Sequence, residues 1–411
     1  MSSEWADCTL GDFVRLQRGH DLTASEQQPG SVPVMGSAGP NGTHSESKSV
    51  GPGVVIGRSG ASMGRVHFSE VDYWPHNTCL YVTDFLGNNP RFAYYLLGTL
   101  DLAAFNSGSA QPSLNRNFIY SMQLQIPNRG EQDGIVKTLR ALDDRITLLR
   151  ETNATLEAIA QALFKSWFVD FDPVRAKLEG HPPEGMDEAT AALFPDGFEE
   201  SELGLVPRGW RVGTVGDLAR QHKGSINPLK NPEILFEHFS LPAFDKQQIP
   251  VLELGTEIKS NKTSVPVDAL LLSKLNPHIP RVWLPVDVGR NAVSSTEFLV
   301  FVPTNGASKE FIFCAFTTDK FKQLLCQLVT GTSNSHQRVK ADGVSAMGAV
   351  IPPQGVLKSF GVLVKPIFSR IGHNRGEAQT LATLRDTLLP RLISGQLRLP
   401  EAGLQIQEAA T

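Results

Sequence analysis

Two polar segments of this chain carry the side-chain types that contact nucleic acid. Residues 106–117 and 330–340 are dense in small hydroxyls, amides and arginine, and each precedes an Ile-Pro pair, Ile126-Pro127 or Ile351-Pro352. Arginine can donate to O6 and N7 of guanine, and asparagine or glutamine can pair with N6 and N7 of adenine. Since the two segments recur at matching places, we interpret them as DNA-contacting loops rather than ordinary polar surface loops.

Two further loops, residues 58–65 and 273–281, occupy comparable places in the two halves of the chain. Windows without acidic residues surround several of these loops, so a phosphate backbone could approach them without like-charge repulsion. The predicted DNA-binding residues are Arg58, Ser59, Arg65, Ser113, Asn115 and Arg116 in the first half, and Lys274, Asn276, Arg281, Ser333, Asn334, His336, Gln337, Arg338 and Lys340 in the second.

We find no recognisable catalytic apparatus. Residues 51–57 miss the GxGxxG spacing of dinucleotide sites, and the Asn-Pro pairs do not continue into a methyltransferase motif. The histidines and cysteines form no zinc or nucleophile pattern. Asp245 with Glu257 and Lys259 faintly resembles a nuclease magnesium site, but so loose a pattern arises by chance. We therefore expect no catalytic residue, metal ligand or cofactor in this chain.

Composition allows two domain cores and a helical connector, since 41% of the 411 residues are hydrophobic. The absence of a long apolar run or a leader pattern predicts a cytoplasmic protein with reduced cysteines. The net charge of −4 at first argues against DNA binding. However, residues 131–200 hold 15 acidic and seven basic residues, so the excess acid lies outside the candidate loops.

The elements that position these loops include two long helices. Apolar residues recur in alternating steps of three and four at Ile135, Leu139, Leu142, Ile146, Leu149, Asn153, Leu156, Ala160, Leu163 and Trp167, and again at Phe360, Val364, Ile367, Ile371, Asn374, Ala378, Leu381, Arg385, Leu388 and Leu392. Each seam holds one asparagine, Asn153 or Asn374, which would fix the register of a coiled coil. We expect the helices to pack on one another rather than to be unrelated core helices. Weak helix formers at 373–376 predict an interruption of the second helix.

The sequence is internally duplicated. Trp5 and Trp210, Leu10–Phe13 and Val215–Leu218, and Gly19 and Gly224 share an offset of 205, and the two Ile-Pro pairs are 225 apart. Each copy joins a block of short strands to a long helix. Expected strands are Gly53–Ile56, Cys79–Val82, Ala269–Leu272 and Phe298–Phe301, and expected shorter helices are Phe92–Leu102 and Lys309–Leu328.

Motifs at the helix ends carry a family resemblance. Phe164–Val174 closes the first helix, Leu384–Gly395 closes the second, and Pro207–Trp210 opens the second block. From Trp5 to about Leu399 the chain resembles the DNA specificity subunits of type I restriction-modification enzymes. The resemblance implies a mixed α/β (α+β) fold, in which two tandem-duplicated target-recognition domains are separated by two long antiparallel helices that form a coiled coil.

The expected organisation is a first target-recognition domain at 1–130, a central spacer helix at 131–169, a linker at 170–207, a second target-recognition domain at 208–353, a C-terminal spacer helix at 354–396 and a tail at 397–411. The linker is rich in acid and proline, and we expect it to wrap the surface rather than to add to a core. By the resemblance, each domain reads one half of a split double-stranded DNA site, and the bases between the halves go unread.

The resemblance also implies partners. Modification subunits would bind S-adenosylmethionine and methylate adenine, and restriction subunits would use ATP and magnesium to cut DNA, so those cofactors belong to the partners. Outward helix faces and the region of Trp167 and Phe168 are the expected docking sites. The alternatives are a self-contained nuclease or methyltransferase, and a structural coiled-coil scaffold whose domains bind something other than DNA.

Overall fold

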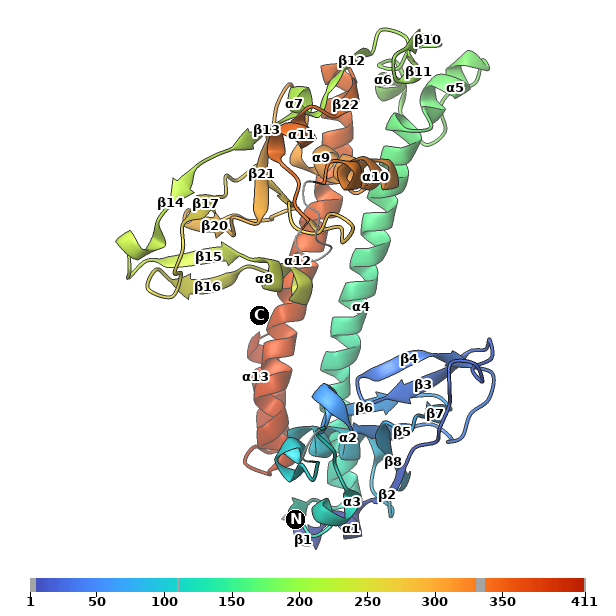
Figure 1. Ribbon diagram of the computed structural model, residues 1–411, viewed down its shortest axis with the longest axis vertical. Helices are drawn as coiled ribbons and strands as arrows, with labels where there is room; N and C mark the ends of the chain where they lie inside the picture. The colour runs from blue at the N-terminus through green and yellow to red at the C-terminus, as the bar shows by residue number, and fades with distance from the viewer. Residues whose placement is uncertain (1–4, 109–110, 330–336, 410–411) are drawn as a thin grey trace. The chain divides into compact units, whose positions relative to one another are not determined.

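The computed structural model describes residues 5–108, 111–329 and 337–409. Ser333, Asn334 and His336 lie outside this range. The chain divides into two compact units. Unit 1 comprises Met1–Thr147 and Gln379–Thr411, and unit 2 comprises Leu148–Ala378. Each unit holds a part of each of two long helices, α4 (Arg129–Phe168) and α12 (Gln354–Ile393), each 40 residues long (Figure 1).

In the part of unit 1 that the structure describes, the strands form three small sheets. They are the antiparallel pair β1 (Ala6–Thr9) and β9 (Gln123–Ile126), a four-stranded sheet ordered β2 (Arg15–Arg18), β8 (Cys79–Asp84), β5 (Gly53–Gly57), β6 (Val66–Ser69), and a three-stranded sheet ordered β4 (Gly39–His44), β3 (Val32–Gly36), β7 (Trp74–Pro75). The shorter helices are α1 (Leu10–Phe13), α2 (Pro90–Thr99), α3 (Arg116–Ile119) and α13 (Leu399–Ala409), with 3₁₀ turns η1 (Gly60–Ser62) and η2 (Leu102–Phe105).

The described residues of unit 2 form four sheets. They are the hairpin β10 (Phe198–Ser201) and β11 (Gly204–Pro207), the pair β12 (Arg211–Thr214) and β22 (Gly348–Ile351), a four-stranded sheet β13 (Ala219–His222), β21 (Phe298–Pro303), β18 (Leu270–Ser273), β19 (Val282–Trp283), and a five-stranded sheet β14 (Ser225–Ile226), β17 (Lys262–Ser264), β20 (Ala292–Ser294), β15 (Leu235–Phe239), β16 (Val251–Leu254). Its shorter helices are α5 (Asp172–Leu178), α6 (Glu188–Ala191), α7 (Val215–Leu218), η3 (Pro228–Lys230), α8 (Leu241–Gln247), α9 (Lys309–Phe316), α10 (Asp319–Gln327) and α11 (Ala341–Ser345).

The duplication seen in the sequence is present in the topology. The sheet order β2-β8-β5-β6 of unit 1 matches β13-β21-β18-β19 of unit 2, and the β1–β9 pair matches β12–β22. Helices α1 and α7 even begin with the same capping box, Thr9 with Asp12 and Thr214 with Asp217. The predicted pair of duplicated, sheet-rich domains with two long helices is therefore confirmed.

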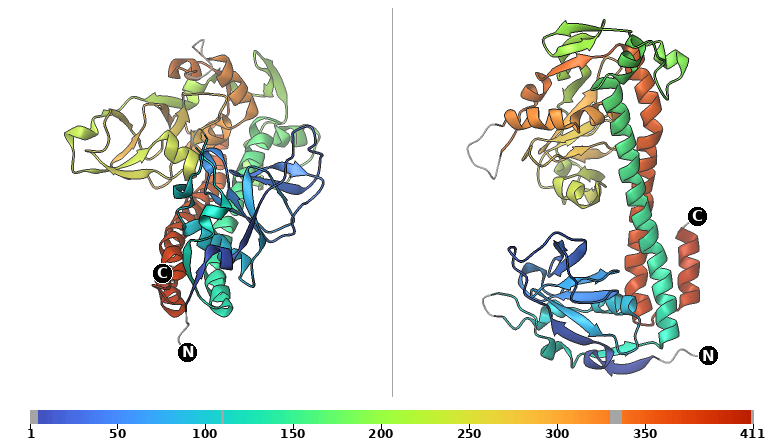
Figure 2. Two further views of the ribbon diagram at one scale, coloured as in Figure 1. Left: turned by 60° about the horizontal axis from the view of Figure 1, so that its bottom comes forward. Right: turned by 90° about the vertical axis from the view of Figure 1, so that its right-hand side faces the viewer.

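The two long helices pack on one another, as the heptad pattern predicts. In unit 2, Nδ2 of Asn374 donates to Oδ1 of Asn153 at 2.8 Å, and the rings of Phe164 and Phe360 lie 5.9 Å apart. Since the residue number rises along α4 while that of its contact on α12 falls, the helices are antiparallel, and they lie side by side in both views of Figure 2. In unit 1, Nη1 of Arg385 donates to Oδ1 of Asp143 at 2.7 Å, which explains an arginine at a seam position.

Helix α12 is continuous through residues 373–376, so the expected interruption was wrong. Asn374 is 1% exposed against Asn153, and the half-buried Arg375 faces the charge of Glu157, while burial raises the pKa of that carboxyl. Gly376 costs a helix only about 1 kcal/mol relative to alanine. Tertiary packing of this turn outweighs its poor helix propensity.

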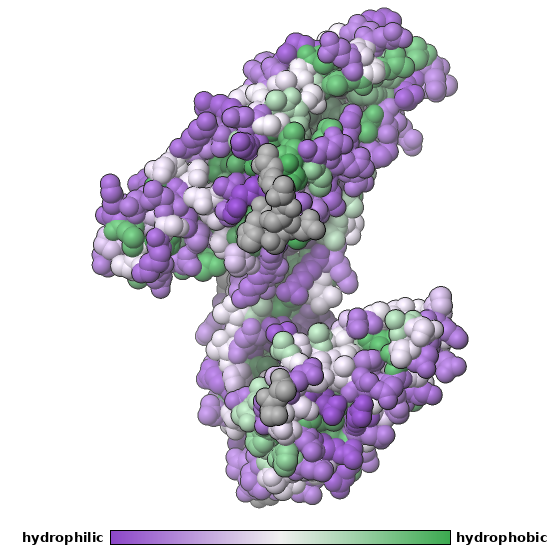
Figure 3. Space-filling view, in the orientation of Figure 1, coloured by the Kyte–Doolittle hydropathy of each residue, from purple (hydrophilic) through white to green (hydrophobic). Residues whose placement is uncertain are grey.

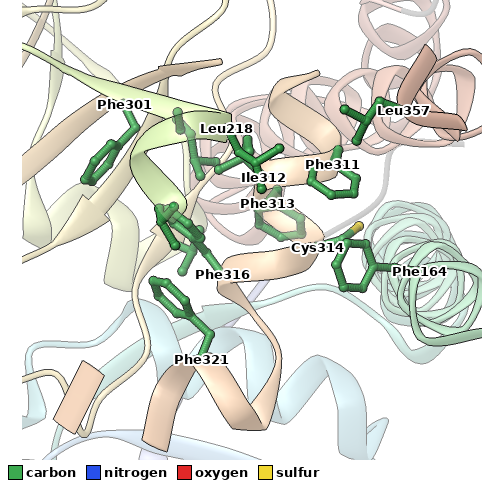
Figure 4. Close-up of a cluster of buried hydrophobic side chains, with 14 of the residues drawn as sticks. Phe164, Leu218, Phe301, Phe311, Ile312, Phe313, Cys314, Phe316, Phe321 and Leu357 are labelled. Atoms are coloured by element: carbon green, nitrogen blue, oxygen red, sulfur yellow. The ribbon is translucent and has the colours of Figure 1, made fainter. Parts of the chain in front are cut away.

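Residues 170–207 do not merely wrap the surface, and that expectation was also wrong. Phe171, Val174 and Phe194 are buried in the same core as α4, α9 and α12. Figure 4 shows Phe164 of α4 and Leu357 of α12 beside the buried face of α9. The segment is rich in acids and prolines, so its average composition did not indicate that a few separated apolar side chains are buried in the core.

The core of unit 1 extends beyond the second long helix. Ile135 and Leu139 of α4 cluster with Leu388 of α12, and the predicted tail folds as α13, whose Ala402 is fully buried in that cluster. Two shorter helices differ from expectation. Residues 309–328 form two helices, because Thr318 caps the new helix α10, and α2 ends at Thr99.

The cysteines behave as core thiols where they are buried. Cys79 and Cys314 are buried and free, and burial raises the pKa of Cys79 to about 12. Among the described helices, none has the length and apolar character that crossing a membrane requires.

Candidate nucleic-acid interface

In unit 1 the two predicted DNA loops lie against each other. The amide of Leu114 donates to the carbonyl of Arg58 at 2.8 Å, and the amide of Gly60 donates to that of Pro112 at 3.1 Å. These bonds form an antiparallel bridge between Ser59 and Ser113. Residues 58–65 and 111–116, far apart in sequence, therefore form one surface.

Unit 2 repeats this arrangement. The amide of Val339 donates to the carbonyl of Lys274 at 3.0 Å, and the amide of Asn276 donates to that of Gln337 at 2.9 Å. An antiparallel bridge joins Leu275 and Arg338. Residues 273–281 and 337–340 thus correspond to the loops of unit 1, and we call the two arrangements the paired loops of each unit.

The matching hydrogen bonds establish which positions are equivalent. Lys274 takes the place of Arg58, and Asn276 takes that of Gly60, with positive φ at both turns, 51° and 76°. Glycine adopts this conformation freely, and asparagine is one of the few other residues that tolerate it. Leu114 and Val339 are the buried anchors of the two bridges, at 0% and 2% exposure.

The same alignment separates two arginines that the sequence suggested as counterparts. Arg338 is equivalent to Ser113, whereas Arg116 begins α3 and is equivalent to Ala341, the first residue of α11. The side chains on a shared backbone frame therefore differ between the units. Because the two units share the backbone arrangement of the paired loops but carry different side chains on it, they are suited to bind two different targets.

The paired loops of unit 1 border a cavity of about 560 Å³ with mostly polar walls. It brings Arg58, Ser113, Asn115 and Arg116 together with side chains that sequence reasoning missed. The additional lining residues are Gln17, Arg18, His20 and Asp21 from β2 and the turn after it. The shared Gly19 and Gly224 marked this turn as duplicated, but nothing in the sequence placed it beside the loops.

Several polar groups in this cavity have internal roles. Nη1 of Arg116 donates to the carbonyl of Leu16 at 2.8 Å, and Oδ1 of Asn115 caps α3 by accepting from the amide of Asn117 at 3.0 Å. Arg65 instead lines a second cavity, which contains Asp143 and Arg385. Arg58 and Ser113 thus lie together with Arg116, and Arg65 lies apart from them.

In unit 2, two arginines are held by carboxylates. Nε and Nη2 of Arg281 contact Asp245 at 2.7 and 2.8 Å, and the same atoms of Arg338 contact Glu297 at 3.1 and 3.2 Å. The Arg281 side chain is 13% exposed and that of Arg338 is 45% exposed. Lys340, which follows the buried Val339 in the chain, is exposed.

The residues once considered for magnesium do not converge. Asp245 binds Arg281, Glu257 accepts from the amide of Leu254 at 2.8 Å, and Lys259 donates to the carbonyl of Thr256 at 2.6 Å. Within the described ranges, no three His, Cys, Asp or Glu side chains are grouped to hold a metal ion.

The residues expected to bind partners or fix register lie in unit 2. Asn153 and Asn374 form the hydrogen-bonded pair described above. Trp167 is 6% exposed, with its ring 5.6 Å from Phe360, while half-buried Phe168 borders an apolar cavity of about 790 Å³. Beyond Phe168 the surface carries exposed apolar side chains at Val169, Leu178, Leu193, Leu203 and Leu205. Figure 3 shows green, hydrophobic patches in the part of the molecule where α5, α6, β10 and β11 lie.

Several known proteins are similar to this chain. Residues 2–158 match the model of the type I restriction modification DNA specificity domain. The chain is 25% identical over 329 residues to the MjaIX specificity subunit of Methanocaldococcus jannaschii, which covers 76% of this chain and 70% of the relative. It is 27% identical over 361 residues to the HindI specificity subunit of Haemophilus influenzae, covering 75% and 77%.

A solved structure shares the fold. The crystal structure of a type I restriction-modification S subunit from M. genitalium superposes with a TM-score of 0.62 at 14% identity, over 95% of this chain and 96% of that one. The pairing of two sheet-rich domains with two long helices is therefore an arrangement found in a known specificity subunit.

Proposed function

We propose, on the premise that this chain belongs to the DNA specificity subunits of type I restriction-modification enzymes, that its paired loops read the two halves of a split duplex target. The chain is a non-catalytic DNA-sequence recognition subunit, and the enzymatic activities reside in partner subunits. The family membership disfavours a self-contained nuclease or methyltransferase, and equally a scaffold whose domains bind something other than DNA.

One observation supports the reading role above all others. The same backbone hydrogen bonds hold the paired loops in both units, yet Arg58 and Ser113 in unit 1 are replaced by Lys274 and Arg338 in unit 2. Contacts to the DNA phosphates position a protein on the duplex, whereas contacts to the base edges specify sequence. A constant frame with variable side chains is what two half-sites of different sequence require.

The residues we propose for DNA contact follow from this geometry. In unit 1 they are Arg58, Ser59, Ser113, Asn115 and Arg116, joined by Gln17 and Arg18, and in unit 2 they are Lys274, Asn276, Gln337, Arg338 and Lys340. We assign Arg281 a supporting role instead, since its guanidinium is mostly buried against Asp245. Arg65 is a candidate for phosphate contact, because it is exposed outside the polar cavity.

We further propose residues 1–130 and 208–353 as the target-recognition domains, 131–169 and 354–396 as spacer helices, 170–207 as a linker and 397–411 as a tail. The continuity of α4 and α12 supports the spacer role, since a helix of 40 residues is about 60 Å long. That length exceeds one turn of B-DNA.

The partners we propose are modification subunits that use S-adenosylmethionine to methylate adenine, and restriction subunits that use ATP and magnesium. A modification subunit would have to flip its target adenine out of the duplex. The exposed apolar side chains from Val169 to Leu205 support a docking site at the end of α4. Because the target is cellular or invading DNA, we place the complex in the cytoplasm.

Selection from a randomised duplex library tests the function. The chain, co-purified with its modification subunit, should enrich duplexes with two short defined sequences separated by a constant number of undefined base pairs. Enrichment of a single uninterrupted sequence, or of none, would contradict the proposal.

A further inference from the structure

A basic residue stands at the same position of the duplicated fold in each unit. Arg18 is the last residue of β2 in unit 1, and Lys223 directly follows β13 in unit 2. In both units the next residue is a glycine, Gly19 or Gly224. Strands β2 and β13 hold equivalent places in the matching sheet orders, so the two cations are carried by the same part of the fold.

Both cations lie beside the paired loops. Arg18 and Arg58 line the same polar cavity of unit 1. In unit 2, strands β13 and β18 flank β21 and run antiparallel to it. Lys223 follows β13 and Lys274 follows β18, so both leave the sheet at the end where β21 begins. Since two strand spacings separate them, their backbones are about 10 Å apart.

The backbone after each cation is closely packed. A Cβ at Gly19 would lie 2.1 Å from the carbonyl oxygen of His76, and one at Gly224 would lie 2.2 Å from Oγ of Ser264. A larger residue at either position would require a neighbour to move. The amide of Gly19 also donates to the carbonyl of Cys79 at 3.0 Å. The place of each cation on the shared frame is therefore fixed.

Both side chains are open to solvent. The Arg18 side chain is 55% exposed, and its Nη2 lies 3.6 Å from Oδ1 of Asp21, whose side chain is 76% exposed. Water screens such an exposed pair, so a phosphate can replace the carboxylate. Lys223 is exposed, and two residues after the glycine of unit 2 stands Ile226, where unit 1 has Asp21. Each cation can therefore face a phosphate.

The positive charge is retained at this position although its surroundings differ between the units. Arg116 of unit 1, for example, is equivalent to Ala341 of unit 2. Arg18 and Lys223 share a charge but not a shape, since an ammonium group cannot make the two-point contacts of a guanidinium group. Charge is what a phosphate requires, and phosphates occur in both half-sites whatever the base sequence.

Arg58 and Lys274 also carry a charge at equivalent positions, but they are half-buried and belong to the paired loops themselves. Half-burial restricts the orientation of a side chain, which suits contacts to base edges. An exposed cation outside the loops acts through its charge in many orientations. Exposure and position thus separate Arg18 and Lys223 from the candidate base readers.

We propose that Arg18 and Lys223 bind DNA phosphates at equivalent places in the two half-sites, and so hold each domain on the duplex whatever its base sequence. The inference rests on the proposed function and gives these two cations a task separate from base reading. Contacts to phosphates fix the register of a protein on DNA. These cations therefore bring the paired loops to the base edges without carrying sequence information themselves.

The test uses the full chain with its modification subunit. Two duplexes of equal length are compared, the one that library selection yields and one of unrelated sequence. Dissociation constants are measured between about 50 and 200 mM salt, because each phosphate contact contributes about 0.9 to the slope of log K against log salt. The selected duplex is also measured with each base pair replaced in turn. The variants are Arg18→Ala, Arg18→Lys and Lys223→Ala.

Two matched controls and one variant of opposite sign complete the set. Lys137→Ala and Lys358→Ala each remove an exposed cation outside the paired loops, on α4 in unit 1 and on α12 in unit 2. Asp21→Asn removes the carboxylate that competes with a phosphate for Arg18.

We expect Arg18→Ala and Lys223→Ala each to weaken binding to both duplexes by the same factor and to lower the salt slope by about 1. Their base preferences should stay those of the wild type. Arg18→Lys should keep the wild-type slope, since an ammonium group also neutralises a phosphate. Asp21→Asn should tighten binding to both duplexes, and the controls should leave the slope unchanged.

Other results would overturn the inference. Loss of discrimination at one base pair in either alanine variant would make that residue a base reader, and an unchanged salt slope would show that it does not contact a phosphate. Both results leave the proposed function in place, whereas a wild-type complex that binds the two duplexes equally would refute that function. Weaker binding by Asp21→Asn would also contradict the inference, and this outcome does not depend on how the alanine variants fold.

Discussion

At the scale of single residues, the sequence identified the correct side-chain types but not their partners. Arg116 and Arg338 both seemed free to read bases, yet one donates to the carbonyl of Leu16 and the other is held by Glu297. Glu297 and Arg18 were missed entirely. Contacts between loops that are distant in sequence depend on the tertiary fold, so no local pattern could have revealed these partners.

Replacing Arg116 and Arg338 separately by alanine tests their different surroundings. Each change should weaken binding by about 1 to 3 kcal/mol at one base pair, in opposite halves of the target. Arg116→Ala should also lower the free energy of unfolding by about 0.5 to 1.5 kcal/mol, because it removes an internal hydrogen bond. Binding titrations and urea unfolding measure both effects. Loss in the same half-site would show that the two units do not read separately.

His238 predicts a pH dependence of stability. Burial lowers its pKa from the ordinary 6.5, against the opposing effect of Glu253. The unfolded chain therefore takes up this proton at a higher pH than the folded chain, so the contribution is present above pH 6.5 and is lost as the pH falls through the lower folded value. Urea unfolding between pH 7.5 and 5 should show falling stability, less steeply in His238→Gln. An equal slope in both proteins would contradict the assignment.

At the scale of elements, heptad spacing predicted both long helices because a repeated seam reports directly on packing. Predictions from helix propensity and from composition failed at two places where tertiary contacts decide the structure. Residues 373–376 stay helical because Asn374 is buried against Asn153 of the other long helix, and the linker 170–207 joins the core through Phe171 and Phe194. The break between α9 and α10, just before Asp319, depends on one capping threonine. A single threonine also occurs within helices, so the sequence hardly distinguishes such a break from the interior of a helix.

The Asn153–Asn374 pair predicts non-additive stability. Asn153→Leu alone leaves the buried amide of Asn374 without its partner and should cost about 1 to 3 kcal/mol. Adding Asn374→Leu should recover most of that loss, because two leucines pack well in a seam. Urea unfolding of both single variants and the double variant completes the cycle. Simple addition of the two single losses would contradict a paired role.

At the scale of the whole molecule, the duplication could be predicted from sequence because Trp5 and Trp210 and the two Ile-Pro pairs recur, and the family resemblance could be predicted from the motifs at the helix ends. The pairing of loops within each domain could not, since it joins segments about 50 residues apart in one unit and about 60 in the other. The distribution of charge was nevertheless informative. The excess acid lies in residues 131–200, outside both sets of paired loops.

Assembly with the modification subunit should depend on the exposed apolar surface after α4. Leu205 is 64% exposed on β11, so Leu205→Asp should leave the fold intact and weaken co-purification with the modification subunit. Leu252→Asp is the matched control, because Leu252 is 61% exposed on β16 of the same unit. Equal loss in both variants, or in neither, would exclude this surface as the docking site.

The central claim is that each set of paired loops reads one half of the target. The most direct test is a base-resolution map of methylated adenines in cells carrying the complete system with wild-type chain, Arg58→Ala or Arg338→Ala. We predict a split target in the wild type, relaxed at one position of a different half in each variant, with the other half and the spacing unchanged. Variants that alter both halves together, or that leave the methylated sequence unchanged, would contradict the account.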